Sequence, residues 1–347
     1  MSTKSVLIIY TGGTIGMVND PATGALCPFN FEQIAKAVPE IKEFGFNIDS
    51  YTLPEIIDSS DLQPSIWADL CRIILERYDR YDGFVILHGT DTMAYSDSAL
   101  SFMLSNLTKP VVFTGSQLPI GTIRTDGREN LIAALEIAAA TLESKAIVPE
   151  VCILFGAKLF RGNRTTKINA ESFEAFQAFN YPPLAEIGIH IHYNYGAIDY
   201  SPKAGPVTAY TQMDTHIAIL QLFPGIRPEL IDSVIGTPGL KGLILETYGS
   251  GNAPTDRTFL SKIKHATDQG ILIYNVTQCQ GGTVEMGRYE TSRELLNYGV
   301  SSGFDITIEA ALCKMMHLLG NYSDPNEIKK YLNSSIKGEI TVNRIGF

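Results

Sequence analysis

Residues 6–16 read VLIIYTGGTIG, a short apolar run followed by a loop of glycines and threonines. The run Val6–Tyr10 is rich in branched aliphatic residues and is followed by a polar, glycine-containing segment, a pattern typical of a buried strand. Other runs with this pattern also predict strands: Phe84–Leu87, Val111–Thr114, Val151–Phe155, Ile217–Leu222, Leu243–Leu245 and Ile271–Val276. The chain is therefore expected to contain a series of short buried strands, most of which end at small polar residues.

Segments with apolar residues at three- and four-residue spacing lie between these runs. They predict helices over Ser65–Tyr78, Ser96–Leu107, Gly127–Leu142 and Ile308–Leu319. Asp324–Glu327 predicts the start of another helix, with Asp as the cap and Pro in the first turn. Strands that alternate with helices along a whole chain indicate an α/β fold with mostly parallel sheets.

The length of 347 residues corresponds to about two domains. The alternation falters between Tyr193 and Met213, a stretch with several Gly and Pro residues and no clear period. We therefore predict a larger N-terminal domain over residues 1–192, a linker over 193–212 and a smaller C-terminal domain over 213–347.

Composition excludes several classes of protein. A hydrophobic fraction of 45% and a charged fraction of 18% are those of a globular chain, and a net charge of -10 disfavours nucleic acids and anionic membranes as partners. No apolar run approaches the roughly 18 residues that span a bilayer, and the first ten residues lack a secretory pattern. The cysteines are dispersed, which indicates free thiols: Cys27, Cys71, Cys152, Cys279 and Cys313. We expect a cytoplasmic protein.

Loops that follow parallel strands are where α/β proteins bind ligands. The loop Thr11–Met17 presents the hydroxyl of Thr14 between glycines, or is simply a glycine-rich turn capped by Thr. It lacks the Gly-Lys-Thr/Ser of a phosphate loop. The loop His88–Met93 repeats the Gly-Thr pattern and adds Asp91, whose carboxylate can accept from an ammonium group. Alternatively, the Thr and Asp residues of this loop only cap the helix that follows it.

A third loop, Arg161–Asn169, carries three cations and is either a solvated surface or a source of one catalytic lysine, Lys167. A threonine hydroxyl attacks a carbonyl only with a base beside it, and a lysine that is partly desolvated among hydroxyls can act as that base. His190 and His192 have no Cys or carboxylate to complete a metal site. We expect neither metal nor cofactor.

These loops belong to a set of six motifs in order along the chain. They are Tyr10–Gly16, Asp58–Asp61, Asp82–Met93, Gly115–Pro119, Arg161–Lys167 and Tyr248–Pro254. With them the sequence resembles the bacterial-type L-asparaginases over nearly its full length, most closely the cytoplasmic type I branch. The resemblance implies hydrolysis of L-asparagine to L-aspartate and ammonia without a cofactor. It also implies two α/β domains in a homodimer or homotetramer, with active sites near subunit contacts.

The resemblance also implies roles for single residues. Thr14 corresponds to the nucleophile, and Thr90 with Lys167 to a second hydroxyl–base pair. Asp91 corresponds to the residue that holds the α-ammonium of the substrate.

Further positions correspond to groups that bind the rest of the substrate. Ser59 and Ser60 match the binders of the α-carboxylate. The turn Gly115–Ser116 matches the segment whose backbone carbonyl receives the side-chain amide. Asn252 matches a residue that reaches a neighbouring subunit's site.

The sequence departs from the family pattern at two places. Many relatives carry a Tyr some ten residues past the nucleophile, whereas residues 24–28 read GALCP. A basic residue that some type I relatives use to bind a second asparagine is Glu246 here, so we expect no such regulatory site. Two other functions stay open: an amino-acid-binding sensor on the same fold, and an amidohydrolase with substantial L-glutamine activity.

Overall fold

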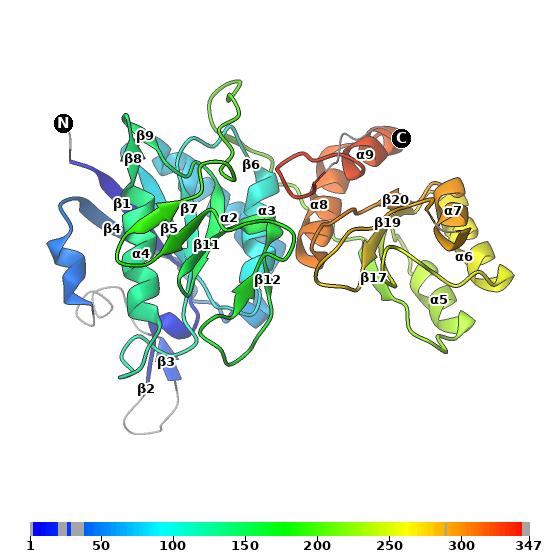
Figure 1. Ribbon diagram of the computed structural model, residues 1–347, viewed down its shortest axis with the longest axis horizontal. Coiled ribbons are helices and arrows are strands. Elements are labelled where there is room, and N and C mark those ends of the chain that lie inside the picture. The colour runs from blue at the N-terminus through cyan, green and yellow to red at the C-terminus, as the bar shows by residue number, and fades with distance from the viewer. Residues whose placement is uncertain (1–2, 20–25, 29–37, 289, 342–347) are drawn as a thin grey trace. The chain divides into compact units, whose positions relative to one another are not determined.

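The computed structural model describes residues 3–19, 26–28, 38–288 and 290–341. The chain divides into two compact units, Met1–Ala209 and Tyr210–Phe347, and each has its own sheet (Figure 1). The boundary lies inside the stretch predicted as a linker, residues 193–212. The finer domain limits stay a prediction.

The first unit is built on a mixed eight-stranded sheet in the order β15-β14-β11-β10-β7-β5-β1-β4. Its strands are β1 (Ser5–Tyr10), β4 (Asn47–Thr52), β5 (Gly83–Leu87), β7 (Val111–Thr114), β10 (Val151–Phe155), β11 (Lys158–Arg161), β14 (Ala185–Ile187) and β15 (Ile191–Tyr193). Strands β4, β1, β5, β7 and β10 pair in parallel. Strands β11, β14 and β15 extend the sheet in antiparallel.

Helices cover both faces of this sheet. Helix α4 (Gly127–Ala139) packs on one face, where alternate residues of the strands, such as Ile8, join its apolar side in one core. The intervening residues, such as Leu7, point to the face of α2 (Pro64–Arg77) and α3 (Met93–Met103), which lie behind the sheet in Figure 1. Because successive side chains point to opposite faces, strands that are apolar throughout need helices on each side.

Short strand pairs and 3-10 helices complete the described part of the first unit. The pairs are β2 (Met17–Asn19) with β3 (Leu26–Pro28), β6 (Leu104–Ser105) with β16 (Thr208–Ala209), β8 (Thr141–Leu142) with β9 (Lys145–Ala146), and β12 (Thr166–Lys167) with β13 (Phe176–Gln177). The 3-10 helices are η1 (Thr14–Gly16), η2 (Pro39–Glu43), η3 (Ser59–Asp61), η4 (Tyr78–Arg80) and η5 (Gly162–Arg164). Two predicted helices, Ser96–Leu107 and Gly127–Leu142, were therefore too long, because β6 and β8 occupy their last residues and satisfy that backbone by pairing.

The strand order places a topological switch at β1. The chain runs from β1 to β4 on one side of it, and then to β5 on its other side. Connections that leave one strand end in opposite directions open a crevice there, and ligands bind in that crevice. The loops after β1, β4 and β5 therefore surround one position at the carboxyl edge of the sheet.

The second unit has a four-stranded parallel sheet in chain order: β17 (Ile217–Gln221), β18 (Gly242–Thr247), β19 (Leu272–Thr277) and β20 (Ser301–Ser302). Its helices are α5 (Pro228–Ile235), α6 (Arg257–Asp268), α7 (Glu290–Asn297), α8 (Ile308–Asn321) and α9 (Pro325–Leu332). Right-handed crossovers in one direction put α5, α6 and α7 on one face, where they share a core with the strands. Helix α8 packs on the other face. The predicted α/β fold with mostly parallel sheets is confirmed for both units.

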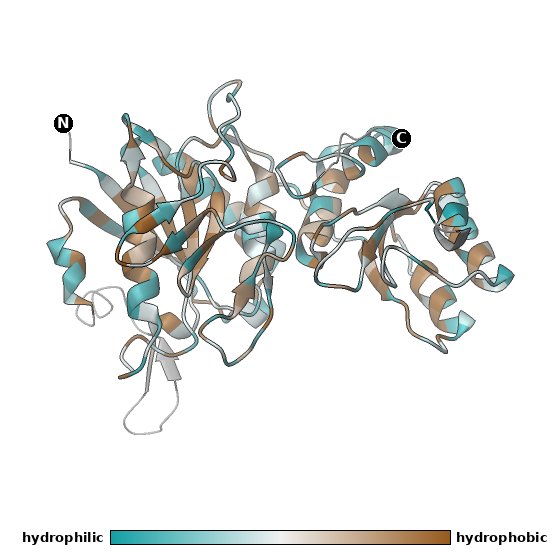
Figure 2. Ribbon diagram, viewed as in Figure 1, coloured by the Kyte–Doolittle hydropathy of each residue, from teal (hydrophilic) through white to brown (hydrophobic). Residues whose placement is uncertain are grey.

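The helix predicted to start at Asp324–Glu327 is present in the second unit as α9. The Asp324 carboxylate accepts from the backbone N–H of Asn326 and caps α9, the helix predicted from that motif. Figure 2 shows hydrophobic residues gathered on the central strands of each sheet.

No helix in the described ranges is long and apolar enough to cross a membrane.

One buried ion pair holds the segment after α9. The Lys314 ammonium on α8 lies 2.7 Å from Glu339 Oε1, and both side chains are fully buried. Lys314 also donates to the carbonyl of Ser334 at 2.7 Å, and Glu339 accepts from the N–H of Lys337 at 2.7 Å. Because both charges are compensated, the low-dielectric interior tolerates them.

Candidate active site

The loops after β1, β4 and β5 are in contact. A Cβ atom on Gly13 would lie 2.4 Å from the backbone nitrogen of Gly89, and one on Gly89 would lie 2.5 Å from Ser59 Oγ. The Thr92 hydroxyl donates to the carbonyl of Ser59 at 2.7 Å. Glycine at positions 13 and 89 thus allows the approach that brings the three loops together.

The loop after β1 turns sharply to present Thr14. Gly12 and Gly13 have φ angles of 132° and 89°, which residues with side chains rarely adopt. The Tyr10 hydroxyl donates to the carbonyl of Gly16 at 2.9 Å and closes the loop. Thr14 opens η1 and is half-buried, and among the described residues nothing hydrogen-bonds to its side chain.

Lys167 joins two residues of the loop after β5. Its ammonium lies 2.8 Å from Thr90 Oγ1 and 2.6 Å from Asp91 Oδ1. The Lys167 side chain is 16% exposed and that of Asp91 is 65% exposed. The structure therefore groups a hydroxyl, a cation and a carboxylate, with the carboxylate still open to solvent.

The rest of the loop that carries Lys167 is held inside the unit. Arg161 is buried and forms an ion pair with Glu150, with Nε 2.6 Å from Oε2. Arg164 is also buried, and its guanidinium lies over the ring of Tyr181. The alternative of a solvated cationic surface is wrong, because the two arginines anchor the loop from which Lys167 projects.

The two candidate serines differ in their surroundings. Ser59 is buried beside Gly89, and among the described residues its hydroxyl has no hydrogen-bond partner. Ser60 is exposed, and its hydroxyl donates to Asp58 Oδ1 at 2.8 Å. The N–H of Ser60 donates to the same oxygen, and these bonds lower the pKa of Asp58.

The Gly115–Ser116 turn adjoins the loop after β5, since a Cβ atom on Gly115 would lie 2.4 Å from the carbonyl oxygen of His88. Ser116 is buried, and its hydroxyl donates to the carbonyl of Leu118 at 2.6 Å. The carbonyl of Gly115 accepts from Asn130.

The next residue, Gln117, was not singled out from the sequence. Its side chain lies 3.5 Å from Thr90 Oγ1, and its amide donates to the carbonyl of Ser172 at 3.0 Å. Only its place beside Ser116 in a strand-end motif could have pointed to it.

Asn252 and Glu246 belong to the second unit. Asn252 forms a backbone bridge with Tyr248, with N–H to carbonyl distances of 2.8 and 2.9 Å. Glu246 lies on β18, and burial raises its pKa. The stretch predicted to lack the family's Tyr is only partly visible: residues 24 and 25 lie outside the described residues, and Leu26–Pro28 form β3.

Within the described ranges, no three His, Cys, Asp or Glu side chains are grouped as metal ligands. Within the described residues, Cys71, Cys152 and Cys313 are buried and form no disulfide, and Cys279 is exposed and forms none either. The side chain of Cys27 lies outside the described part of the structure.

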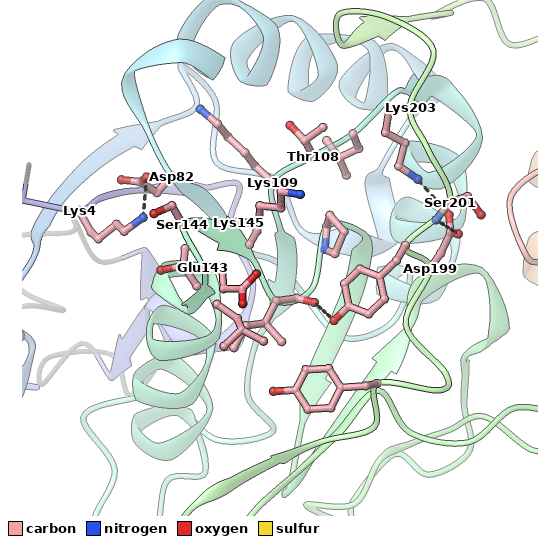
Figure 3. A pocket seen from close by; sticks show the side chains of 18 residues that line it. Lys4, Asp82, Thr108, Lys109, Glu143, Ser144, Lys145, Asp199, Ser201 and Lys203 are labelled. Atoms are coloured by element: carbon pink, nitrogen blue, oxygen red, sulfur yellow. Dashed lines mark hydrogen bonds and ion pairs between the residues drawn. The ribbon is translucent and has the colours of Figure 1, made fainter. Parts of the chain in front are cut away.

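A separate cavity of about 680 Å³ lies at the opposite edge of the sheet (Figure 3). Its walls include Lys4 and Asp82, which precede β1 and β5, together with Lys145, Asp199 and Lys203. Lys4 pairs with Asp82 at 3.3 Å, and Lys203 pairs with Asp199 at 3.0 Å. Because parallel strands share one direction, the amino edge with this cavity is distinct from the carboxyl edge that holds Thr14 and Thr90.

Two Gly-Thr loops at the switch point, with the carboxylate of Asp91 and the ammonium of Lys167 beside them, fit the chemistry of an amidohydrolase. Residues 5–199 match the family model "Asparaginase, N-terminal", and residues 216–332 match "Glutaminase/Asparaginase C-terminal domain". The chain belongs to the asparaginase family.

Individual relatives agree over the whole length. The chain is 42% identical to L-asparaginase 1 of Escherichia coli K12, covering 98% of this chain and 99% of that protein. The crystal structure of L-asparaginase I from Vibrio cholerae superposes with a TM-score of 0.89 at 38% identity, over 98% of this chain and 100% of that one. The thermostable L-asparaginase from Thermococcus kodakarensis gives a TM-score of 0.87 at 33% identity, over 97% and 99%.

Proposed function

We propose that this chain hydrolyses L-asparagine to L-aspartate and ammonia, with the hydroxyl of Thr14 as nucleophile. The observation that carries the proposal is the Lys167 ammonium within 2.8 Å of the Thr90 hydroxyl, beside the loop of Thr14. Membership of the asparaginase family and the similarity to L-asparaginase 1 support the substrate.

The reaction has two halves. In the first, Thr14 Oγ1 attacks the side-chain carbonyl carbon, its proton passes to a base, and the amide nitrogen leaves as ammonia after it takes up a proton. In the second, Lys167, acting as the neutral amine, takes the proton of the Thr90 hydroxyl while Thr90 takes a proton from the water that attacks the β-aspartyl ester. The proton held by Lys167 then passes to Thr14 Oγ1 as the ester bond breaks. Aspartate leaves, and the Thr14 hydroxyl is restored.

Backbone N–H groups of the Gly-Thr loops stabilise the oxyanion that forms in both halves. Among the described residues, nothing accepts a hydrogen bond from the N–H of Thr14 or Thr90. These donors are therefore free to point at developing negative charge.

Substrate groups outside the reacting amide are assigned in the same way. Asp91, largely exposed, holds the α-ammonium, and the free hydroxyl of Ser59 binds the α-carboxylate. Ser60 joins Ser59 when its hydroxyl leaves Asp58. The backbone at Ser116 receives the side-chain amide, and Asn252 completes a neighbouring subunit's site.

The assignment of Asn252 requires an assembly, so the chain is proposed to form a homodimer or homotetramer in the cytoplasm. Sedimentation velocity measures that state directly. A monomer at the concentration used for assays that is fully active would contradict it.

The test of the activity is the release of ammonia from L-asparagine by the purified chain. L-Glutamine at the same concentration measures the competing specificity. A chain that binds asparagine in calorimetry but releases no ammonia is a sensor, and the proposed hydrolysis is then wrong.

A further inference from the structure

A buried chain of hydrogen bonds ends at the residue before Thr90. Trp67 Nε1 lies 2.9 Å from Ser96 Oγ, and Ser96 Oγ lies 2.9 Å from His88 Nε2. The other ring nitrogen of His88, Nδ1, lies 2.7 Å from the carbonyl oxygen of Gly89. All three side chains are buried, with 4%, 0% and 1% of their surface exposed for Trp67, Ser96 and His88.

The direction of each of these hydrogen bonds follows from the two ends of the series, where one group can only donate and the other can only accept. An indole nitrogen only donates, so the oxygen of Ser96 accepts from Trp67. At the other end, the carbonyl oxygen of Gly89 can only accept, so Nδ1 of His88 carries a proton and donates it. A neutral imidazole has only this one proton, so Nε2 is unprotonated and accepts from the hydroxyl of Ser96.

Burial keeps His88 neutral. It lowers the pKa of His88 to about 4, and the bond to the Gly89 carbonyl opposes this effect only in part. An imidazolium would need two acceptors, and Ser96 could accept from it only by giving up its own donation. The buried series of hydrogen bonds thus selects one charge state and one tautomer of the His88 ring.

The held carbonyl sets the orientation of the next peptide. The described peptide bonds are all trans, so the carbonyl of Gly89 and the N–H of Thr90 point in opposite directions. With the carbonyl held toward His88, the N–H of Thr90 points away from it. Because nothing in the described ranges accepts from that N–H, it remains available to a substrate.

We propose that Ser96 and Trp67 are positioning residues for the reaction: they hold His88 in its Nδ1–H tautomer and thereby fix the Gly89–Thr90 peptide against the substrate. This rests on the proposed function, since it assigns a use to the freed N–H of Thr90. Ser96 and Trp67 act only through His88.

The tautomer can be measured in the unmodified protein. The ¹⁵N chemical shifts of a histidine ring separate a protonated from an unprotonated nitrogen, and the His88 signals are assigned by their loss in His88→Gln. We expect a proton on Nδ1 and none on Nε2 at neutral pH. A proton on Nε2 would overturn the proposal.

Kinetics test the positioning role. Ser96→Ala leaves His88 free to move its proton to Nε2, so kcat for asparagine should fall about three- to tenfold while KM changes less than about twofold. Ser98→Ala is the matched control, because its hydroxyl is buried on the same helix and has no partner in the described structure. It should leave both constants unchanged. Trp67→Phe removes the indole N–H, and it is the variant to test if Ser96→Ala does not fold.

Each outcome has one reading. A folded Ser96→Ala or Trp67→Phe with wild-type kcat overturns the positioning role, as does an equal loss in Ser98→Ala. If the wild-type chain releases no ammonia at all, the proposed function fails, and the tautomer measurement still tests the hydrogen-bond chain by itself.

Discussion

Lys167 and Thr90 are 77 residues apart in the chain, yet the ammonium of one lies 2.8 Å from the hydroxyl of the other. The same ammonium lies 2.6 Å from Asp91. One side chain thus spans the hydroxyl expected to activate water and the carboxylate expected to hold the substrate. Changes at these positions should separate chemistry from binding.

Replacement of Lys167 by Met keeps the apolar stem and removes the amine. Turnover of asparagine should be abolished, because the Thr90 hydroxyl loses the group that takes its proton. Binding should remain measurable by isothermal titration calorimetry. Substantial turnover in the folded variant would place the base elsewhere.

Thr14→Ala removes the proposed nucleophile and leaves the backbone of its loop unchanged. We expect kcat to fall by on the order of 10³-fold or more, as for other removed nucleophiles. Circular dichroism should show an unchanged fold. Near-wild-type ammonia release would exclude Thr14 from that role.

Asp91→Asn tests recognition of the α-ammonium. The variant should lose kcat/KM for asparagine, because an amide does not neutralise the ammonium charge. Succinamic acid, which has the same amide and carboxylate but no amine, should be affected much less. Equal losses for both compounds would show that Asp91 acts on something other than the ammonium.

Two buried histidines should make stability depend on pH. Burial lowers the pKa of both His88 and His317 from 6.5 to about 4. Between these values the unfolded chain binds more protons than the folded one. The contribution of the two histidines to the free energy of unfolding is therefore complete above pH 6.5 and is lost as the pH is lowered toward 4. Each histidine contributes at most about 3 kcal/mol to this fall.

Urea denaturation at a series of pH values measures this fall. His317→Asn should flatten the slope between pH 6.5 and 4, whereas His192→Asn, at an exposed position, should not. The carboxylates of Asp199 and Asp214, whose pKa values are lowered to about 2, act in a separate and more acidic range. A slope unchanged in His317→Asn would contradict the assignment.

The buried pair of Lys314 and Glu339 should dominate the stability of the second unit. Lys314→Met leaves a buried carboxylate without its cation, and we expect a loss of about 3–5 kcal/mol in the free energy of unfolding. Lys264→Met, which breaks an exposed pair with Asp268, is the control and should have little effect. Similar losses in both variants would show that burial does not set the cost.

Most of the parallel framework could be predicted from the sequence. The runs Val6–Tyr10 and Val151–Phe155 are short, apolar and bounded by polar or glycine residues, and they form β1 and β10. In contrast, β4 reads NIDSYT and lies at the sheet edge, largely exposed, so its sequence carries no apolar run to predict it. The antiparallel strands β11 and β14 have no such run either, since they are short and partly polar.

The residue types of the site were also visible in the sequence, because glycine and threonine at a strand end are a local pattern. Their partners were not. The hydrogen bond of Ser60 to Asp58, the place of Gln117 beside Thr90 and the chain from Trp67 through Ser96 to His88 follow no spacing rule.

By itself, then, the sequence determined the strands, the loops that follow them and the chemistry those loops offer. Only the tertiary structure decided that β1 lies between β4 and β5. It also placed the Lys167 ammonium 2.8 Å from the Thr90 hydroxyl, a pairing that no local pattern indicated and that only the family resemblance implied. The physical reason is the separation along the sequence over which each effect acts. Hydrophobic periodicity and turn residues act over a few neighbours, whereas strand order and side-chain pairing depend on how distant segments pack together.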